Sequence, residues 1–266
     1  MTKKAGHTMI DYKLVMNTAI LAGELMLCSG AETYRVEDTM NHILNTTHAQ
    51  TVEVSVMMTG IVATLGNPDM EPITATKRVQ ERGTNLNSIM EVNEISRRYC
   101  AGDLPLEEAY ERLQKIGPKQ YRVWLFNLAV IMVSSGFAPL FGGGLIEMAA
   151  AIVTGGVLAL VMTAGKKLQI SGFIQTLLCS FAVAVSAILL KQVLPMVDDN
   201  IITMSSIMPL VPGVAITNAV RDTLLGDYIS GAARILEAFL IAAAVALGVG
   251  TGMALMGVFF PGGGLA

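Results

Sequence analysis

The chain has 266 residues, of which 53% are hydrophobic and 15% are charged. This composition is too apolar for an ordinary soluble domain and indicates a protein that crosses a membrane. The formal net charge of −3 provides no basic surface for phosphate groups, so it argues against a nucleic-acid partner. Cys28, Cys100 and Cys179 are widely spaced and form no C-x-x-C motif, which suggests neither a disulfide framework nor a zinc site.

Charged residues are concentrated in the first part of the chain. Residues 1–122 hold 13 of the 18 Lys and Arg residues and 15 of the 21 Asp and Glu residues. We therefore predict two domains, with a boundary near Gly117-Pro118. Residues 1–120 are expected to form a small cytoplasmic α+β domain, and residues 121–266 an α-helical transmembrane domain.

The first domain opens with two predicted helices, an amphipathic one over 11–29 that ends at Gly30 and a second over 32–47. Short runs rich in β-branched residues, separated by turn signals, then predict a small antiparallel sheet. Pro105 and the acidic residues after it open the last helix of the domain. The predicted strands are 52–57, 60–65 and 71–78, and the predicted later helices are 87–101 and 105–117.

A polar motif, Gly30-Ala-Glu-Thr-Tyr-Arg-Val-Glu37, opens the second predicted helix. Glu32 and Arg35 are three residues apart and can pair on a solvated helix surface, while acidic residues near a helix N-terminus are favourable with its dipole. A purely structural explanation of this motif therefore stands beside a functional one.

The first domain contains no nucleotide-binding loop, nucleophile elbow or metalloprotease motif. His42 and His48 have no further ligands at suitable spacing. We accordingly predict no catalytic residue, no metal site and no cofactor, and we expect that the chain is not an enzyme.

Five apolar stretches follow, each close to or above the roughly 20 residues needed to cross a hydrocarbon core. Lysines and arginines precede the first stretch and flank the loops after the second and fourth. On the opposite side, the loop after the first stretch carries no charge and the loop after the third carries Asp198 and Asp199. The positive-inside rule then places the N-terminal domain in the cytoplasm and the C-terminus outside. The predicted spans are 123–141, 145–164, 170–194, 201–220 and 235–260.

The fourth stretch contains Pro209, Pro212 and Gly213, followed by polar residues. Proline removes a backbone donor and clashes with the preceding turn, so we predict a break between Met208 and Gly213. Transporters build substrate sites at such breaks. The alternative is a proline kink that only helps to pack a helix bundle.

Two other features of the predicted spans stand out. Glu147 lies one turn into the second span, where a carboxylate is costly unless it faces a cavity or a partner; it is either a proton-carrying group or an interfacial residue that reaches water. Gly248-x-x-x-Gly252 in the fifth span predicts close contact with another helix.

Two stretches of the chain together resemble the two signatures of the threonine/serine exporter family: Gly30-Ala-Glu-Thr-Tyr-Arg-Val-Glu37, and Pro209-Leu-Val-Pro212-Gly213 … Asn218-Ala-Val-Arg221-Asp222 … Gly226-Asp227 … Gly231. The resemblance covers nearly the whole chain and matches the order of its domains. Fused members of the family carry about ten spans. With five, this chain is similar to the larger subunit of the split members, which work with a separate small five-span membrane protein.

The resemblance implies a secondary transporter subunit in the bacterial cytoplasmic membrane that exports threonine and serine, or a dicarboxylate such as succinate. Membrane lipid and a higher oligomer are further expected partners. Two alternatives stay open: a membrane-anchored hydrolase that uses Glu32, Glu37 or His42, and a regulatory subunit without its own permeation path.

Under this interpretation, amides freed at the break hold the substrate carboxylate at mid-membrane. Asp222 is expected to hold Arg221 in place, and Glu147 is the candidate for proton coupling. The predicted substrate path consists of Pro209, Pro212, Gly213, Asn218, Arg221 and Asp222. The predicted gate, which docks the first domain, consists of Gly30, Glu32, Tyr34, Arg35 and Glu37.

Overall fold

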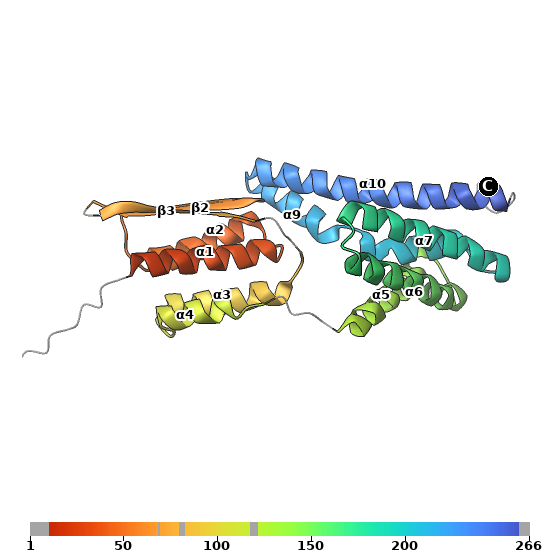
Figure 1. Ribbon diagram of the computed structural model, residues 1–266, viewed down its shortest axis with the longest axis horizontal. Coiled ribbons are helices and arrows are strands. Elements are labelled where there is room, and N and C mark those ends of the chain that lie inside the picture. The colour runs from red at the N-terminus through yellow and green to blue at the C-terminus, as the bar shows by residue number, and fades with distance from the viewer. Residues whose placement is uncertain (1–10, 69, 80–82, 118–121, 261–266) are drawn as a thin grey trace, which may run out of the picture. The chain divides into compact units, whose positions relative to one another are not determined.

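The structure, a computed structural model, describes residues 11–68, 70–79, 83–117 and 122–260. The chain divides into two compact units: the first contains Met1–Lys119 and Val214–Ile235, and the second contains Gln120–Gly213 and Leu236–Ala266. The predicted boundary near Gly117-Pro118 adjoins residues 118–121, which lie outside the described ranges. The elements, most of them labelled in Figure 1, are α1 (Tyr12–Cys28), α2 (Thr33–Asn45), β1 (Thr51–Met57), β2 (Gly60–Asn67), β3 (Met70–Arg78), α3 (Leu86–Cys100), α4 (Leu106–Gln114), α5 (Val123–Phe137), η1 (Ala138–Phe141), α6 (Leu145–Lys167), α7 (Gly172–Val193), α8 (Asp199–Ile207), η2 (Met208–Leu210), α9 (Gly213–Leu224) and α10 (Tyr228–Phe259).

Local chemistry sets both ends of α1. Asp11 caps the N-terminus by accepting the Leu14 N–H at 2.9 Å. After the C-terminus, Gly30 has a φ of +83°, and a Cβ there would lie 2.8 Å from the carbonyl oxygen of Gly83. Glycine is therefore required in the α1–α2 turn (residues 29–32), both by the left-handed backbone and by the close approach of another segment.

The three strands form an antiparallel sheet in the order β1-β2-β3. Val54 lies opposite Ala63, and Ala63 lies opposite Ala75, so the three side chains share one face of the sheet. Helices α1 and α2 form a layer between this sheet and the pair α3 and α4 (Figure 1). The predicted small antiparallel sheet with helices packed on it is confirmed.

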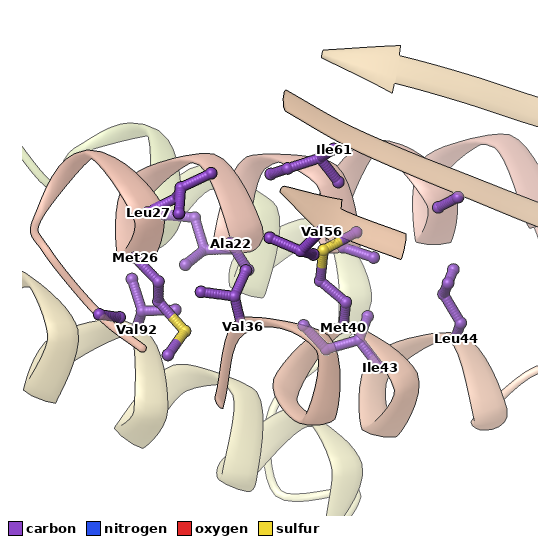
Figure 2. Packing of buried hydrophobic residues seen from close by; sticks show 14 of the residues in the cluster. Ala22, Met26, Leu27, Val36, Met40, Ile43, Leu44, Val56, Ile61 and Val92 are labelled. Carbon is purple, nitrogen blue, oxygen red and sulfur yellow. The ribbon is translucent and has the colours of Figure 1, made fainter. Parts of the chain in front are cut away.

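One hydrophobic core joins these layers. Figure 2 shows Met26 of α1, Met40 of α2 and Ile61 of β2 among its members, and all three are at most 1% exposed. A Cβ at Gly23 of α1 would lie 2.4 Å from the Met40 sulfur, so the glycine lets the two helices approach closely. Each such buried side chain stabilises the fold by about 1.5–3 kcal/mol, more than an exposed ion pair contributes.

The second unit is a bundle of α5–α8 with the later part of α10. Small residues allow the close contacts: a Cβ at Gly155 of α6 would lie 2.8 Å from Ser134 Cβ of α5, and a Cβ at Gly248 of α10 would lie 2.4 Å from the Leu177 carbonyl oxygen of α7. The helix contact predicted for Gly248-x-x-x-Gly252 therefore forms within this chain.

The described residues contain four helices that are long and apolar enough to cross a membrane, and a fifth span if the interrupted pair Asp199–Leu210 and Gly213–Leu224 counts as one. The chain is therefore a multi-pass membrane protein. The four uninterrupted spans are Val123–Phe141, Leu145–Lys167, Gly172–Val193 and Tyr228–Phe259.

The break predicted before Gly213 is confirmed. Helix α8 gives way to the short 3-10 helix η2, Val211 is extended with φ −67° and ψ 126°, and α9 begins at Gly213. The predicted span 201–220 is thus not one continuous helix, and Val214–Ile235 belongs to the first unit rather than to the membrane domain expected there. Pro209 and Pro212 interrupt the helix. Polar side chains on one face of α9 contact other residues of the first unit, and for this reason α9 groups with that unit.

Candidate functional site

The α1–α2 turn presents two backbone carbonyl groups that α9 and α10 bind. The Asn218 side chain of α9 donates to the carbonyl oxygen of Gly30 at 2.8 Å. The Arg234 Nη2 of α10 donates to the carbonyl oxygen of Ala31 at 2.9 Å. Asn218 and Arg234 are 7% and 6% exposed, so both bonds are shielded from water. All of these residues belong to the first unit.

Asp222 of α9 sits at the start of α2. Its carboxylate accepts the Thr33 N–H and the Thr33 hydroxyl, both at 3.2 Å. The first N–H groups of a helix have no partner within the helix, and the carboxylate supplies one and also favours the positive end of the dipole. Arg234 Nε lies 2.9 Å from Asp222 Oδ2, an ion-pair distance, although its N–H is not directed at that oxygen.

Glu32 links two arginines on either side of the same turn. Its Oε1 contacts Arg221 Nη1 of α9, and its Oε2 lies 3.3 Å from Arg35 Nη1 of α2. The Glu32 side chain is 10% exposed, whereas those of Arg221 and Arg35 are 50% and 40% exposed. The carboxylate is therefore largely buried, while both arginine side chains reach solvent.

These contacts form one cluster, which we call the turn–α9 cluster: Gly30, Ala31, Glu32, Thr33, Arg35, Asn218, Arg221, Asp222 and Arg234. It brings together residues from both predicted groups, the gate and the substrate path. The expectation that Asp222 holds Arg221 is wrong. Consecutive helical residues point in different directions, so Asp222 faces Thr33 and Arg234 while Arg221 faces Glu32.

The remaining glycines of the second stretch shape the corner between α9 and α10. Gly226 has a φ of +94°, and the Asp227 N–H that follows donates to the Asp222 carbonyl oxygen at 2.9 Å. Asp227 Oδ1 then accepts the Ser230 N–H at 3.1 Å at the start of α10. A Cβ at Gly231 would lie 2.2 Å from Thr223 Oγ1 and 3.1 Å from the backbone oxygen of Ala219, so glycine permits this close approach.

A family profile described as "Putative threonine/serine exporter" matches residues 17–256. The chain belongs to this family. Both stretches that meet in the turn–α9 cluster lie within the matched region. No solved structure matches the chain.

Curated relatives carry two kinds of name. A "Probable threonine/serine exporter" from Mycobacterium tuberculosis is 24% identical over 241 residues, which is 88% of this chain but 45% of the relative. The chain thus spans about half the length of that relative. A "Probable succinate transporter subunit YjjP" from Klebsiella aerogenes is 26% identical over 93% of this chain and 96% of its own. The protein of the same name from Escherichia coli is 27% identical over 92% of this chain and 96% of its own length.

Two predicted gate residues of this exporter-family chain lie beside the cluster. Tyr34 is 42% exposed on the surface of α2. Glu37 ties α2 to the sheet, because its Oε1 accepts the Val56 N–H of β1 at 2.8 Å. Burial raises the pKa of the Glu37 carboxyl, the bond from Val56 opposes that rise, and the Asp227 carboxylate adds to it.

Glu37→Gln tests the energetic consequence of that raised pKa. A carboxyl whose pKa is higher in the folded state destabilises the fold above that pKa, and the penalty vanishes below the ordinary value of 4.5. The amide keeps an oxygen for the Val56 N–H. We expect the variant to protect the Val56 amide from hydrogen exchange more than wild type does at pH 7, and equally at about pH 4. Equal protection at both pH values would contradict this.

The other predicted residues lie in or next to the second unit. Pro209 is in η2, and Pro212 directly precedes Gly213, the first residue of α9. Glu147, in the first turn of α6, accepts the Gly144 N–H at 2.7 Å and so caps that helix. Within the described ranges, no three His, Cys, Asp or Glu side chains are grouped to hold a metal ion.

Sequence reasoning missed Thr33 and Arg234. Thr33 stands inside the first motif, but nothing in the sequence distinguishes it from its charged neighbours as a site residue. Arg234 precedes an apolar run, and its position beside the loop between the fourth and fifth spans predicts an orientation charge rather than a residue of the site. The signal that could identify Arg234 is its position near the start of a membrane helix, where a cation needs a partner if it is buried.

Proposed function

We propose that this chain is a subunit of a secondary transporter that exports small carboxylate-bearing metabolites, either threonine and serine or a dicarboxylate such as succinate. Its membership of the exporter family and its apolar helices support this. The name of the YjjP relatives includes the word subunit, which supports a separate partner. That partner is a small five-span membrane protein of the same family.

The turn–α9 cluster carries the mechanistic part of the proposal. It fixes the α1–α2 turn to α9, the helix that directly follows the break, so the cluster acts as a latch on the permeation path. Ile216, Val220 and Leu224 form an i, i+4, i+8 row on α9 and are 47%, 52% and 80% exposed. A helix with a polar buried face and an apolar exposed face suits a membrane boundary.

The substrate path begins at the break. The first amides of α9 have the positive end of a helix dipole and favour a carboxylate, the group shared by threonine, serine and succinate. Arg221 is half exposed and can exchange Glu32 for a passing carboxylate. Asn218 and Asp222 keep α9 in place during that exchange.

The proposed orientation follows the charges. Lys166 and Lys167 end α6, and Arg221 and Arg234 flank the α9–α10 corner, whereas Asp198 and Asp199 mark the opposite side. The first unit is then cytoplasmic and the C-terminus is outside. Membrane lipid covers the exposed apolar helices, and the complex with the partner can assemble further into a higher oligomer.

Efflux from preloaded cells tests this function. Cells containing labelled threonine, serine or succinate express this chain alone, the five-span partner alone, or both. We expect efflux of one substrate class only when both proteins are present. Efflux by the partner alone would make this chain a regulatory subunit. No efflux in any combination, with both proteins shown to be in the membrane, would contradict the proposal.

Proton coupling through Glu147 is a separate prediction. Glu147→Gln keeps an oxygen that can cap the Gly144 N–H, so the fold should persist while the titrating group is lost. We expect wild-type export to follow the proton gradient in inverted membrane vesicles, and the variant to lose that dependence. A variant that responds to the gradient as wild type does would remove Glu147 from the coupling mechanism.

A further inference from the structure

One face of α8 carries three polar residues at helical spacing. Asp199, Thr203 and Ser206 are separated by four and three residues, so their side chains lie along one stripe of the helix. They are 5%, 3% and 0% exposed. The stripe ends directly before η2 and the break, and α8 packs against α5, α6 and α7 within the second unit.

The two ends of the stripe have partners from neighbouring helices. The Lys191 ammonium of α7 donates to Asp199 Oδ1 at 2.5 Å. The Ser206 hydroxyl lies 2.6 Å from the Thr154 hydroxyl of α6. The Lys191 side chain is 36% exposed and the Asp199 side chain 6%, so this end of the stripe opens toward solvent.

Thr203, between these ends, has no hydrogen-bond partner for its buried hydroxyl among the described residues. Serines and threonines in apolar helices usually donate to a carbonyl of their own helix, as Ser205 does to Ile202 at 3.0 Å. A buried polar group without a partner is rare and points to a ligand or an ordered water. The Thr203 hydroxyl is therefore a group to which a polar solute could bind.

We propose that the α8 stripe binds a small zwitterion, with its ammonium on Asp199, its carboxylate on Lys191 and its side-chain hydroxyl on Thr203. One anionic and one cationic group stand side by side, which complements an α-amino acid. A dicarboxylate fits less well, because its second carboxylate would meet Asp199. This inference rests on the proposed function, and it adds a binding station that precedes the break along the chain.

Inverted membrane vesicles that contain this chain and its five-span partner test the site. The measured quantity is the KM for uptake of labelled L-serine, which corresponds to export, with succinate as the second probe. Thr203→Val removes only the hydroxyl, and we expect it to raise the KM about tenfold or more. Thr203→Ser should retain a KM near wild type. Ser205→Ala is the matched control, because that buried hydroxyl bonds within its own helix.

The zwitterion requirement has its own variant. Asp199→Asn is expected to abolish L-serine uptake, and raising the L-serine concentration should not restore it, because the ammonium loses its anionic partner. Thermal unfolding of each variant separates binding from folding. Val in place of an unpartnered hydroxyl is expected to leave the melting temperature unchanged or raised. A purely structural Thr203 would give a wild-type KM for Thr203→Val, and that result overturns the proposal.

Binding measured without transport separates this inference from the proposed function. L-serine is expected to raise the melting temperature of the detergent-solubilised wild-type chain, and not that of Thr203→Val. If vesicles transport none of the substrates but this shift depends on Thr203, the site stands and the exporter function fails. If vesicles transport succinate alone and L-serine gives no shift, the site fails and the exporter function stands.

Discussion

Asp222→Ala is expected to destabilise the first unit by about 3–5 kcal/mol, the usual effect of removing one partner of a buried ion pair. The Asp222 side chain is 0% exposed and that of Arg234 is 8% exposed, so the change leaves a buried guanidinium without its counter-charge. It also removes the acceptor for the Thr33 N–H and hydroxyl at the start of α2. Urea denaturation of the full-length chain in detergent, followed by circular dichroism, measures the loss.

Two further variants define what that loss means. Asp38→Ala is the matched control: its side chain is 67% exposed and pairs with His42 at 3.4 Å, so its removal should cost less than about 1 kcal/mol. Asp222→Leu combined with Arg234→Met replaces the buried pair by apolar groups and should recover much of the stability. Equal stabilities for Asp222→Ala and Asp38→Ala would show that the buried pair does not support the fold.

Local rules were sufficient for most of the elements. Gly30 as a terminator and the β-branched runs after residue 50 act over a few residues, and the helices and strands they predict are present. The break could also be predicted, since Pro209 and Pro212 lack a backbone N–H donor whatever the surrounding structure. Apolar length alone also identified the uninterrupted spans.

The pairing inside the turn–α9 cluster was beyond those rules. The Thr33 and Asp222 bond joins residues 189 positions apart, and no spacing in the sequence connects them. Proximity along the chain suggested Arg221 as the partner of Asp222, but a helix turns neighbouring side chains away from each other. The unpartnered Thr203 hydroxyl was also invisible, because a threonine in an apolar run ordinarily bonds to its own helix.

Reversing the charge of Arg221 or Glu32 is expected to reduce export at least about tenfold, because each change places like charges against each other at the largely buried position 32. In Arg221→Glu, the new carboxylate would face Glu32, whose side chain is 10% exposed. In Glu32→Arg, the new guanidinium would face both Arg221 and Arg35. The double variant restores an opposite-charge pair between the turn and α9, so export should return in part.

Arg112→Glu serves as the control for charge reversal in the same unit. Arg112 pairs with Glu108 at 2.6 Å on the surface of α4, with side chains 41% and 48% exposed. The change reverses an arginine of an i, i+4 ion pair that lies within one helix and outside the turn–α9 cluster. Export by this variant should match wild type, because an exposed pair contributes little.

The direct test of the latch is the initial rate of efflux from loaded cells, compared across wild type, Arg221→Glu, Glu32→Arg, the double variant and Arg112→Glu at equal amounts in the membrane. The latch predicts low rates for both single reversals and a wild-type rate for Arg112→Glu. For the double variant it predicts a rate above both single reversals but below wild type, because position 221 then lacks the guanidinium that meets the substrate carboxylate. Wild-type efflux by Arg221→Glu, or no recovery in a folded double variant, would contradict it.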